Sequence, residues 1–121
     1  MFVSPGAPAG EPGALLDRIL AAIGYSRSSV HILDMQAPGW AERIRGLAPQ
    51  VIVALGETAA HGLTGSDEPL SRIRGVWRQY RDAGLVCRLL PTYHPEDLLR
   101  DPALKRDVWQ DMKALKTELE G

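Results

Sequence analysis

The sequence predicts an α/β fold, a three-layer α/β/α sandwich in which a mainly parallel sheet lies between helices. Apolar runs suited to strands alternate with segments of helical periodicity, and this alternation is typical of parallel sheets. The clearest run, residues 51–55, is apolar at every position, as a strand buried on both faces requires. A length of 121 residues and a hydrophobic fraction of 45% suit one core, so we expect residues 1–121 to form a single domain.

The individual elements follow from local patterns in the sequence. Strands are predicted over residues 1–3, 30–33, 51–55, 73–80 and 85–90, the last two joined as a hairpin through 81–84. Helices are predicted over residues 14–24, 40–47, 57–63 and from 102 to 119, with Asp101 as the cap of the last one. Residues 4–13 are dense in glycine, proline and alanine and are predicted to form a loop.

Composition and charge limit the classes of partner. The formal net charge of −1 gives no global positive field, so binding to DNA needs a local basic patch. Arginines in the second half of the chain are candidates, although a solvated face with interspersed acids explains them equally well. These arginines are Arg72, Arg74, Arg78, Arg81, Arg88 and Arg100. The single cysteine, Cys87, forms no intrachain disulfide and is expected to be a buried, inert thiol.

Targeting signals are not visible in the sequence. No run of 18 apolar residues appears, so no transmembrane helix and no membrane partner are expected. The start of the chain does not resemble a secretory signal, and a cytoplasmic protein is expected.

Residues 92–100 form the most informative segment. His94 follows the predicted strand 85–90, so it lies at the carboxyl end of a strand, where α/β proteins place their ligands. Pro95 fixes its own φ and restricts His94 to extended conformations. A leucine pair and Arg100 follow, which places a titratable group, an apolar tip and a cation within one short segment.

Several segments in the same order resemble the family-four, bacterial-type uracil-DNA glycosylases. These segments are residues 13–20, 53–56, 73–77, 92–95 with 98–100, and 102–111. The resemblance implies a four-stranded, mainly parallel sheet and base excision repair, the hydrolysis of the N-glycosidic bond of a uracil or other damaged base flipped out of DNA.

The resemblance also implies roles for particular residues. His94 would donate a hydrogen bond to O2 of the leaving uracil and stabilise its developing negative charge. Gly6, Gly56 and Pro95 would belong to the substrate pocket. The residues expected to contact DNA are Leu98 or Leu99 as a wedge, Arg100 at a phosphate or fixing the loop, and Arg74.

Three departures from the family pattern concern catalysis. The loop that holds the attacking water in the family is shortened here. Glu11 is the only acid left in it, and it is either a general base or simply a solvated loop glutamate. Asp34 stands where the family has an asparagine that reads the uracil edge; because a carboxylate only accepts, it favours a base with an amino group, or is simply an exposed aspartate. The cysteines that bind the family's iron–sulfur cluster are absent, so we expect no cofactor and no metal.

Two functional hypotheses follow from these observations. The chain is either a uracil-DNA glycosylase-like protein, whose activity is retained, reduced or lost, or a non-catalytic module that binds nucleic acid or a nucleotide. DNA is the expected partner in the first case. The short first strand leaves neighbouring backbone groups to be paired, and a monomer or weak dimer is expected.

Overall fold

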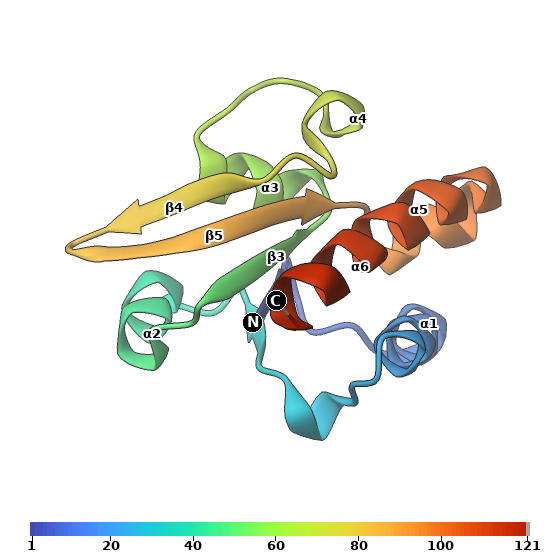
Figure 1. Cartoon of the computed structure of the whole chain (residues 1–121), viewed down its shortest axis with the longest axis horizontal. Helices are drawn as coiled ribbons and strands as arrows, with labels where there is room; N and C mark the ends of the chain where they lie inside the picture. The colour runs from blue at the N-terminus through green and yellow to red at the C-terminus, as the bar shows by residue number, and fades with distance from the viewer. Residues whose placement is uncertain (121) are drawn as a thin grey trace.

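The computed structural model describes residues 1–120 and contains a five-stranded sheet (Figure 1). The strand order is β2-β1-β3-β5-β4, in which the first four strands are parallel and β4 runs antiparallel to β5. The strands are β1 (Phe2–Ser4), β2 (Ile32–Asp34), β3 (Val51–Leu55), β4 (Arg78–Asp82) and β5 (Leu85–Thr92). The predicted fold class is confirmed, with one strand more than the resemblance implied.

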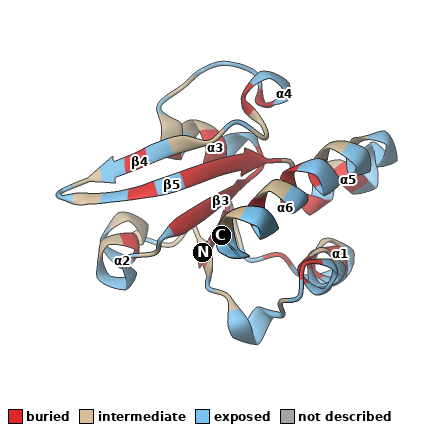
Figure 2. Ribbon diagram, in the orientation of Figure 1, coloured by how far each residue is buried: buried red, intermediate tan, exposed pale blue. Residues whose placement is uncertain are grey.

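Helices cover both faces of the sheet. They are α1 (Gly10–Ala22), α2 (Trp40–Leu47), α3 (Glu57–Thr64), α4 (Leu70–Ile73), α5 (Pro95–Arg100) and α6 (Lys105–Glu120), with short 3-10 turns at Arg27–Ser29 and Pro102–Leu104. Side chains of α1, α5 and α6 pack with Val51, Val53 and Leu55 of β3. Side chains of α2, α3 and α4 pack with Ile52 and Ala54 on the other face. Figure 2 shows β3 as a buried strand between the two layers.

The hairpin differs in part from its prediction. Residues 70–73 form α4 and Gly75 takes a φ of +70°, so the predicted strand over 73–80 is wrong at its start and the strand begins at Arg78. Ala83 and Gly84 both have positive φ, as in the two-residue turns that match the twist of antiparallel strands.

The C-terminal helical region is divided where one continuous helix was predicted. Asp101 accepts a hydrogen bond from the backbone N–H of Ala103 at 3.2 Å, which confirms its capping role. It caps only a 3-10 turn, however, and α6 begins at Lys105. A separate helix, α5, begins directly after His94.

The short strand β1 is paired on both sides. Phe2 lies opposite Ile32 of β2 and Val53 of β3, and the backbone oxygen of Ser4 accepts from the N–H of Met35 at 2.8 Å. Its three residues are buried. The backbone groups at the centre of the sheet are therefore satisfied within the chain, and the oligomeric state remains a prediction.

Within residues 1–120, no helix combines the length and the apolar character that crossing a membrane requires.

Candidate active site

The candidate site lies at the carboxyl ends of the parallel strands. The connection through α1 places β2 on one side of β1, and the connection through α2 places β3 on the other side. Strand order therefore reverses at β1, and ligands of open α/β sheets bind in the crevice at such a point. Ser4 ends β1, Gly56 follows β3, and His94 follows β5 at this edge.

His94 is the N-cap of α5, and hydrogen bonds hold both its ring and its backbone. Its Nδ1 accepts from the backbone N–H of Glu96 at 3.0 Å, and its backbone N–H donates to Asp97 Oδ2 at 3.0 Å. Its Nε2 lies 2.9 Å from the hydroxyl oxygen of Ser4. The backbone is extended, with φ −76° and ψ 148°, as predicted for the residue before Pro95.

These contacts fix the tautomer of His94. A neutral imidazole carries one ring proton, and Nδ1 already accepts a hydrogen bond. The proton must therefore be on Nε2, which donates to Ser4 Oγ. Burial lowers the pKa of His94 below its ordinary value; Glu96 and Asp97 act in the opposite direction with a smaller effect. His94 is consequently a neutral donor at neutral pH.

The lowered pKa of His94 predicts a pH-dependent stability. Below about pH 6.5 the unfolded chain binds a proton at His94 that the folded protein binds only at lower pH, so the wild type loses stability as the pH falls through this range. The wild type should therefore lose more free energy of unfolding between pH 7.5 and 5.5 than a His94→Gln variant. Urea unfolding at both pH values measures the free energy of unfolding of each protein. The prediction is contradicted if the wild type loses no more of this free energy than His94→Gln when the pH falls.

Gly56 allows the close approach of His94 to the sheet. Strand β3 lies between β1 and β5, so the bond from His94 to Ser4 passes over the end of β3. A Cβ at position 56 would lie 3.1 Å from the Cβ of His94, and Gly56 has a φ of +91°. Both the space and the backbone conformation therefore favour glycine.

A cavity of about 230 Å³ adjoins His94. Its lining comes from the loop after β1, the start of α3 and both ends of α5. The lining residues are Pro5, Gly56, Glu57, Thr58, His94, Glu96, Asp97 and Arg100. The volume lies below the roughly 300–1,000 Å³ of pockets for drug-sized ligands, which suits a group as small as a single base. The cavity thus combines a neutral donor, carboxylates and the amino end of α3, where partial positive charge is concentrated.

The structure does not bring Glu11 or Asp34 to this cavity. Glu11 lies exposed in the first turn of α1. Asp34 Oδ1 accepts from the backbone N–H groups of Gly6 at 2.9 Å and Gln36 at 2.8 Å, so it ties the loop after β1 to the turn after β2. The roles of Glu11, Asp34 and Gly6 in a reaction remain predictions from the sequence.

Sequence reasoning missed three carboxylates that line the cavity, those of Glu57, Glu96 and Asp97. Glu57 follows Gly56 directly at the end of β3, and Glu96 lies two residues after His94. The positions of Glu57 and Glu96 carry a signal that was available, because an acid two residues after a buried strand or a site histidine lies near the same edge of the sheet.

The candidate DNA-contacting residues occupy different environments. Leu98 is buried in the core, whereas Leu99 is exposed on α5. Arg100 lines the cavity and its Nη2 lies 2.7 Å from Asp97 Oδ1. Arg74 instead contacts the buried carboxylate of Asp111 through Nε at 3.2 Å and Nη2 at 2.8 Å. Hydrogen bonding to Asp111 is the main cause that raises the pKa of Arg74 above its usual value.

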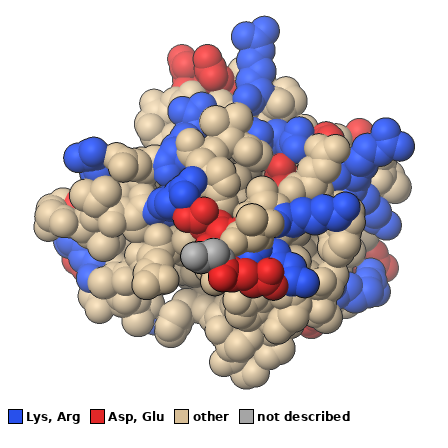
Figure 3. Space-filling view, viewed as in Figure 1, with Lys and Arg blue, Asp and Glu red and all other residues tan. Residues whose placement is uncertain are grey.

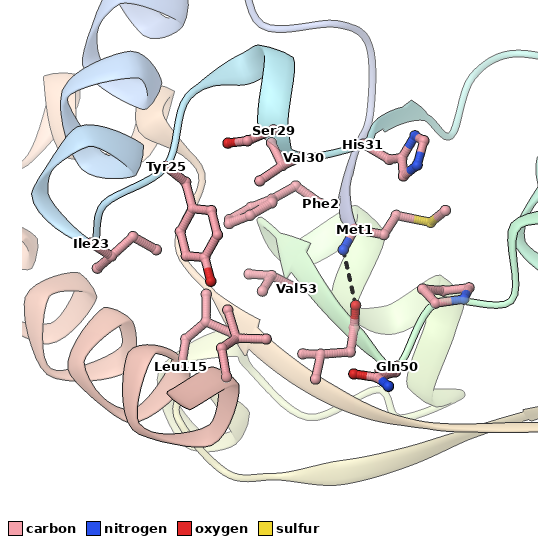
Figure 4. Close-up of a pocket in the computed structure, with 13 residues that line it drawn as sticks. Met1, Phe2, Ile23, Tyr25, Ser29, Val30, His31, Gln50, Val53 and Leu115 are labelled. Carbon is pink, nitrogen blue, oxygen red and sulfur yellow. Dashed lines mark hydrogen bonds between the residues drawn. The ribbon is translucent and has the colours of Figure 1, made fainter. Parts of the chain in front are cut away.

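A second cavity of about 260 Å³ opens at the opposite edge of the sheet. Figure 4 shows Phe2, Tyr25, Val53 and Leu115 around it, with the amino group of Met1 donating to the backbone oxygen of Val51 at 3.0 Å. Its lining is mostly apolar and lacks His94. The two cavities are therefore distinguishable by any method that reports which end of the sheet a ligand contacts.

The family comparison is decisive for the class of protein. A family model described as the uracil DNA glycosylase superfamily matches residues 4–113. The chain belongs to this superfamily. The match extends from β1 into α6, so it includes both sides of the His94 site. It confirms the family that the sequence resembles.

Individual relatives in the superfamily agree with this assignment. The chain is 30% identical to the Type-4 uracil-DNA glycosylase of Pyrobaculum aerophilum, in a match that covers 85% of this chain and 64% of that protein. The proteins of the same name from Archaeoglobus fulgidus and Saccharolobus solfataricus are 26% and 24% identical, over 88% and 91% of this chain and 64% and 62% of theirs. The chain thus spans slightly less than two thirds of the length of these relatives.

The iron–sulfur cluster that the resemblance implies does not fit this chain. Such clusters are held by several cysteine thiolates, and the sequence has one cysteine. Cys87 is buried in β5, and burial raises the pKa of its thiol, which disfavours the thiolate that a metal requires.

Proposed function

We propose that the His94 site binds a uracil flipped out of DNA and hydrolyses its N-glycosidic bond, as a first step of base excision repair. The observation that carries the proposal is the neutral His94, protonated on Nε2 and fixed beside a base-sized cavity at the carboxyl edge of the sheet. Membership of the superfamily and the similarity to proteins named Type-4 uracil-DNA glycosylase support it.

The chemistry of the cavity suits the charges of this reaction. When the bond between the sugar carbon and the base breaks, the electron pair leaves with the base and positive charge develops on the sugar. The Nε2–H of His94 and the amides at the start of α3 stabilise the anionic base. The carboxylates of Glu57 and Glu96 favour the cationic sugar and accept a proton from the attacking water.

Surface residues near α5 support a path for DNA. Leu99 is exposed beside Arg100, so it is placed to fill the space of a flipped base, whereas Leu98 is occupied in the core. Figure 3 shows Lys and Arg side chains gathered at the end of the molecule formed by α5 and the start of α6. Within residues 1–120, Arg18, Lys105, Arg106 and Lys113 form no ion pair, which leaves them free for phosphates.

Release of free uracil from DNA tests the proposal. The substrate is a single-stranded oligonucleotide with one uracil, and the matched control has thymine at the same position. We expect free uracil, an abasic site and no release of thymine. Further oligonucleotides carry hypoxanthine, xanthine or an alkylated base in place of uracil. If none of these bases and no uracil is released, the glycosylase reaction is excluded for this chain.

A non-catalytic binding module is the second candidate. It is favoured by one observation, that the single ring N–H of neutral His94 already bonds to Ser4. This function predicts salt-dependent binding of the same oligonucleotide without base release. DNA as the partner and a cytoplasmic location are part of both proposals.

A further inference from the structure

Ser4 and His94 form a buried pair whose members lie 90 residues apart in the sequence. Their 2.9 Å hydrogen bond connects the last residue of β1 to His94, which lies two residues after the end of β5. Ser4 is fully buried and His94 is 8% exposed. Because the neutral ring has only one N–H, this bond uses the whole donor capacity of the imidazole.

We propose that the Ser4 hydroxyl occupies the Nε2–H donor of His94 in the free protein. An oxygen of the base must displace this hydroxyl before it can accept a hydrogen bond from His94. The inference rests on the proposed function and deepens it, because it names a residue that controls the access of the base to the donor. Ser4 acts through His94 and is therefore a positioning residue.

The ring of His94 is anchored more firmly than its partner. Turning the imidazole breaks the bond from the Glu96 N–H to Nδ1, and moving its backbone breaks the bond to Asp97, which Arg100 holds in turn. Gly56 packs directly against the Cβ of His94. A base that reaches Nε2 therefore meets a ring already in place.

The Ser4 hydroxyl is the part that moves. The backbone of Ser4 is held by β1 pairing and by the Met35 N–H, but rotation about a single side-chain bond redirects its hydroxyl. Pro5, the next residue, and His94 both line the cavity, and the fully buried Ser4 lies behind them, bonded to the His94 ring. Exchange of a hydroxyl for a base oxygen at Nε2 needs no movement of the sheet.

Nuclear magnetic resonance of the histidine ring tests the inference. In ¹⁵N-labelled Ser4→Ala protein, the Nε2 proton of His94 should exchange with solvent faster than in the wild type. Free uracil, titrated into both proteins, should bind the variant about fivefold more tightly, the equivalent of one neutral hydrogen bond of about 1 kcal/mol. The midpoint of thermal unfolding should fall, because the variant leaves a buried donor without an acceptor.

Matched variants separate this effect from a general loss of structure. Thr64→Ala removes a hydroxyl that bonds the Ala60 backbone oxygen at the far end of α3, and it should change neither His94 nor the affinity for uracil. Ser4→Thr keeps the hydroxyl and should restore wild-type behaviour. If Ser4→Ala does not fold, side-chain couplings of Ser4 in the wild type decide the question, because saturating uracil must change its rotamer.

The possible outcomes are distinct. Three results would overturn the proposed displacement of the Ser4 hydroxyl. These are unchanged proton exchange in Ser4→Ala, unchanged or weaker uracil binding by this variant, and a Ser4 rotamer that does not change when uracil binds. None of these results depends on release of uracil from DNA by the wild type, which tests the proposed function separately.

Discussion

Replacement of Arg74 by alanine is expected to lower the free energy of unfolding by about 3–5 kcal/mol, because it leaves a buried carboxylate without its cation. Asp111 is 2% exposed, and its carboxylate receives two hydrogen bonds from Arg74 and one from the Thr92 hydroxyl at 2.6 Å. With Arg74 removed, Thr92 alone satisfies the charge. The Arg74–Asp111 pair joins the end of α4 to α6, and the bond from Thr92 to Asp111 joins α6 to the last residue of β5, two residues before His94.

Urea unfolding of Arg74→Ala and Lys116→Ala measures this effect. Lys116 lies 3.8 Å from Glu120 in an exposed pair on α6, and its loss should cost about 0.3–0.5 kcal/mol. A loss below about 1 kcal/mol in Arg74→Ala contradicts the structural role. A large loss also means that weaker DNA binding by this variant is no test of a phosphate contact, so contact of Arg74 with DNA remains a prediction.

Replacement of His94 by alanine is expected to lower the rate of uracil release by about 10²–10³-fold. Removal of one preorganised donor from an anion-stabilising site has an effect of this size. The change also removes the acceptor of the Glu96 N–H and the side-chain cap of α5, so stability should fall by about 1 kcal/mol.

The measurement of His94→Ala needs a control in which a histidine outside the site is replaced by alanine. His31→Ala serves, because His31 is exposed and precedes β2 at the opposite edge of the sheet. It should release uracil at the wild-type rate. Rates are compared at a temperature at which both proteins are folded by circular dichroism, and equal rates in the wild type and His94→Ala argue against His94 as the donor.

Local patterns in the sequence were sufficient for the framework of the site. The apolar run at 51–55 gave β3 its correct bounds, and Trp40–Leu47 is the predicted helix. Pro95 restricts its neighbour through short-range sterics, which is why the extended conformation of His94 was predictable. These features depend on residues that are adjacent in sequence.

Contacts between distant strands were not predictable in the same way. The Ser4–His94 bond requires that β1 and β5 lie on either side of β3, and that β3 ends in a glycine that leaves the space open. Sequence periodicity does not determine strand order. The position of Ser4 directly after an apolar strand start gave no sign of its partner.

The role of Arg74 had a signal that was not used. Asp111 lies on the face of α6 that carries Val108, Met112 and Leu115 into the core. A carboxylate on a buried face needs a cation or several hydrogen bonds. That requirement indicates a buried partner for Asp111 among the arginines, although sequence alone does not identify which one.

The most direct test of the account is to map where a uracil-containing oligonucleotide contacts the chain. Amide chemical shifts of the ¹⁵N-labelled protein are followed during titration with the uracil oligonucleotide and its thymine counterpart. We predict uracil-specific shifts at Gly56, Glu57, His94 and Glu96. Shifts confined to the cavity at the other edge, around Phe2, Tyr25 and Val53, or identical shifts with both oligonucleotides, would contradict a base-binding site at His94.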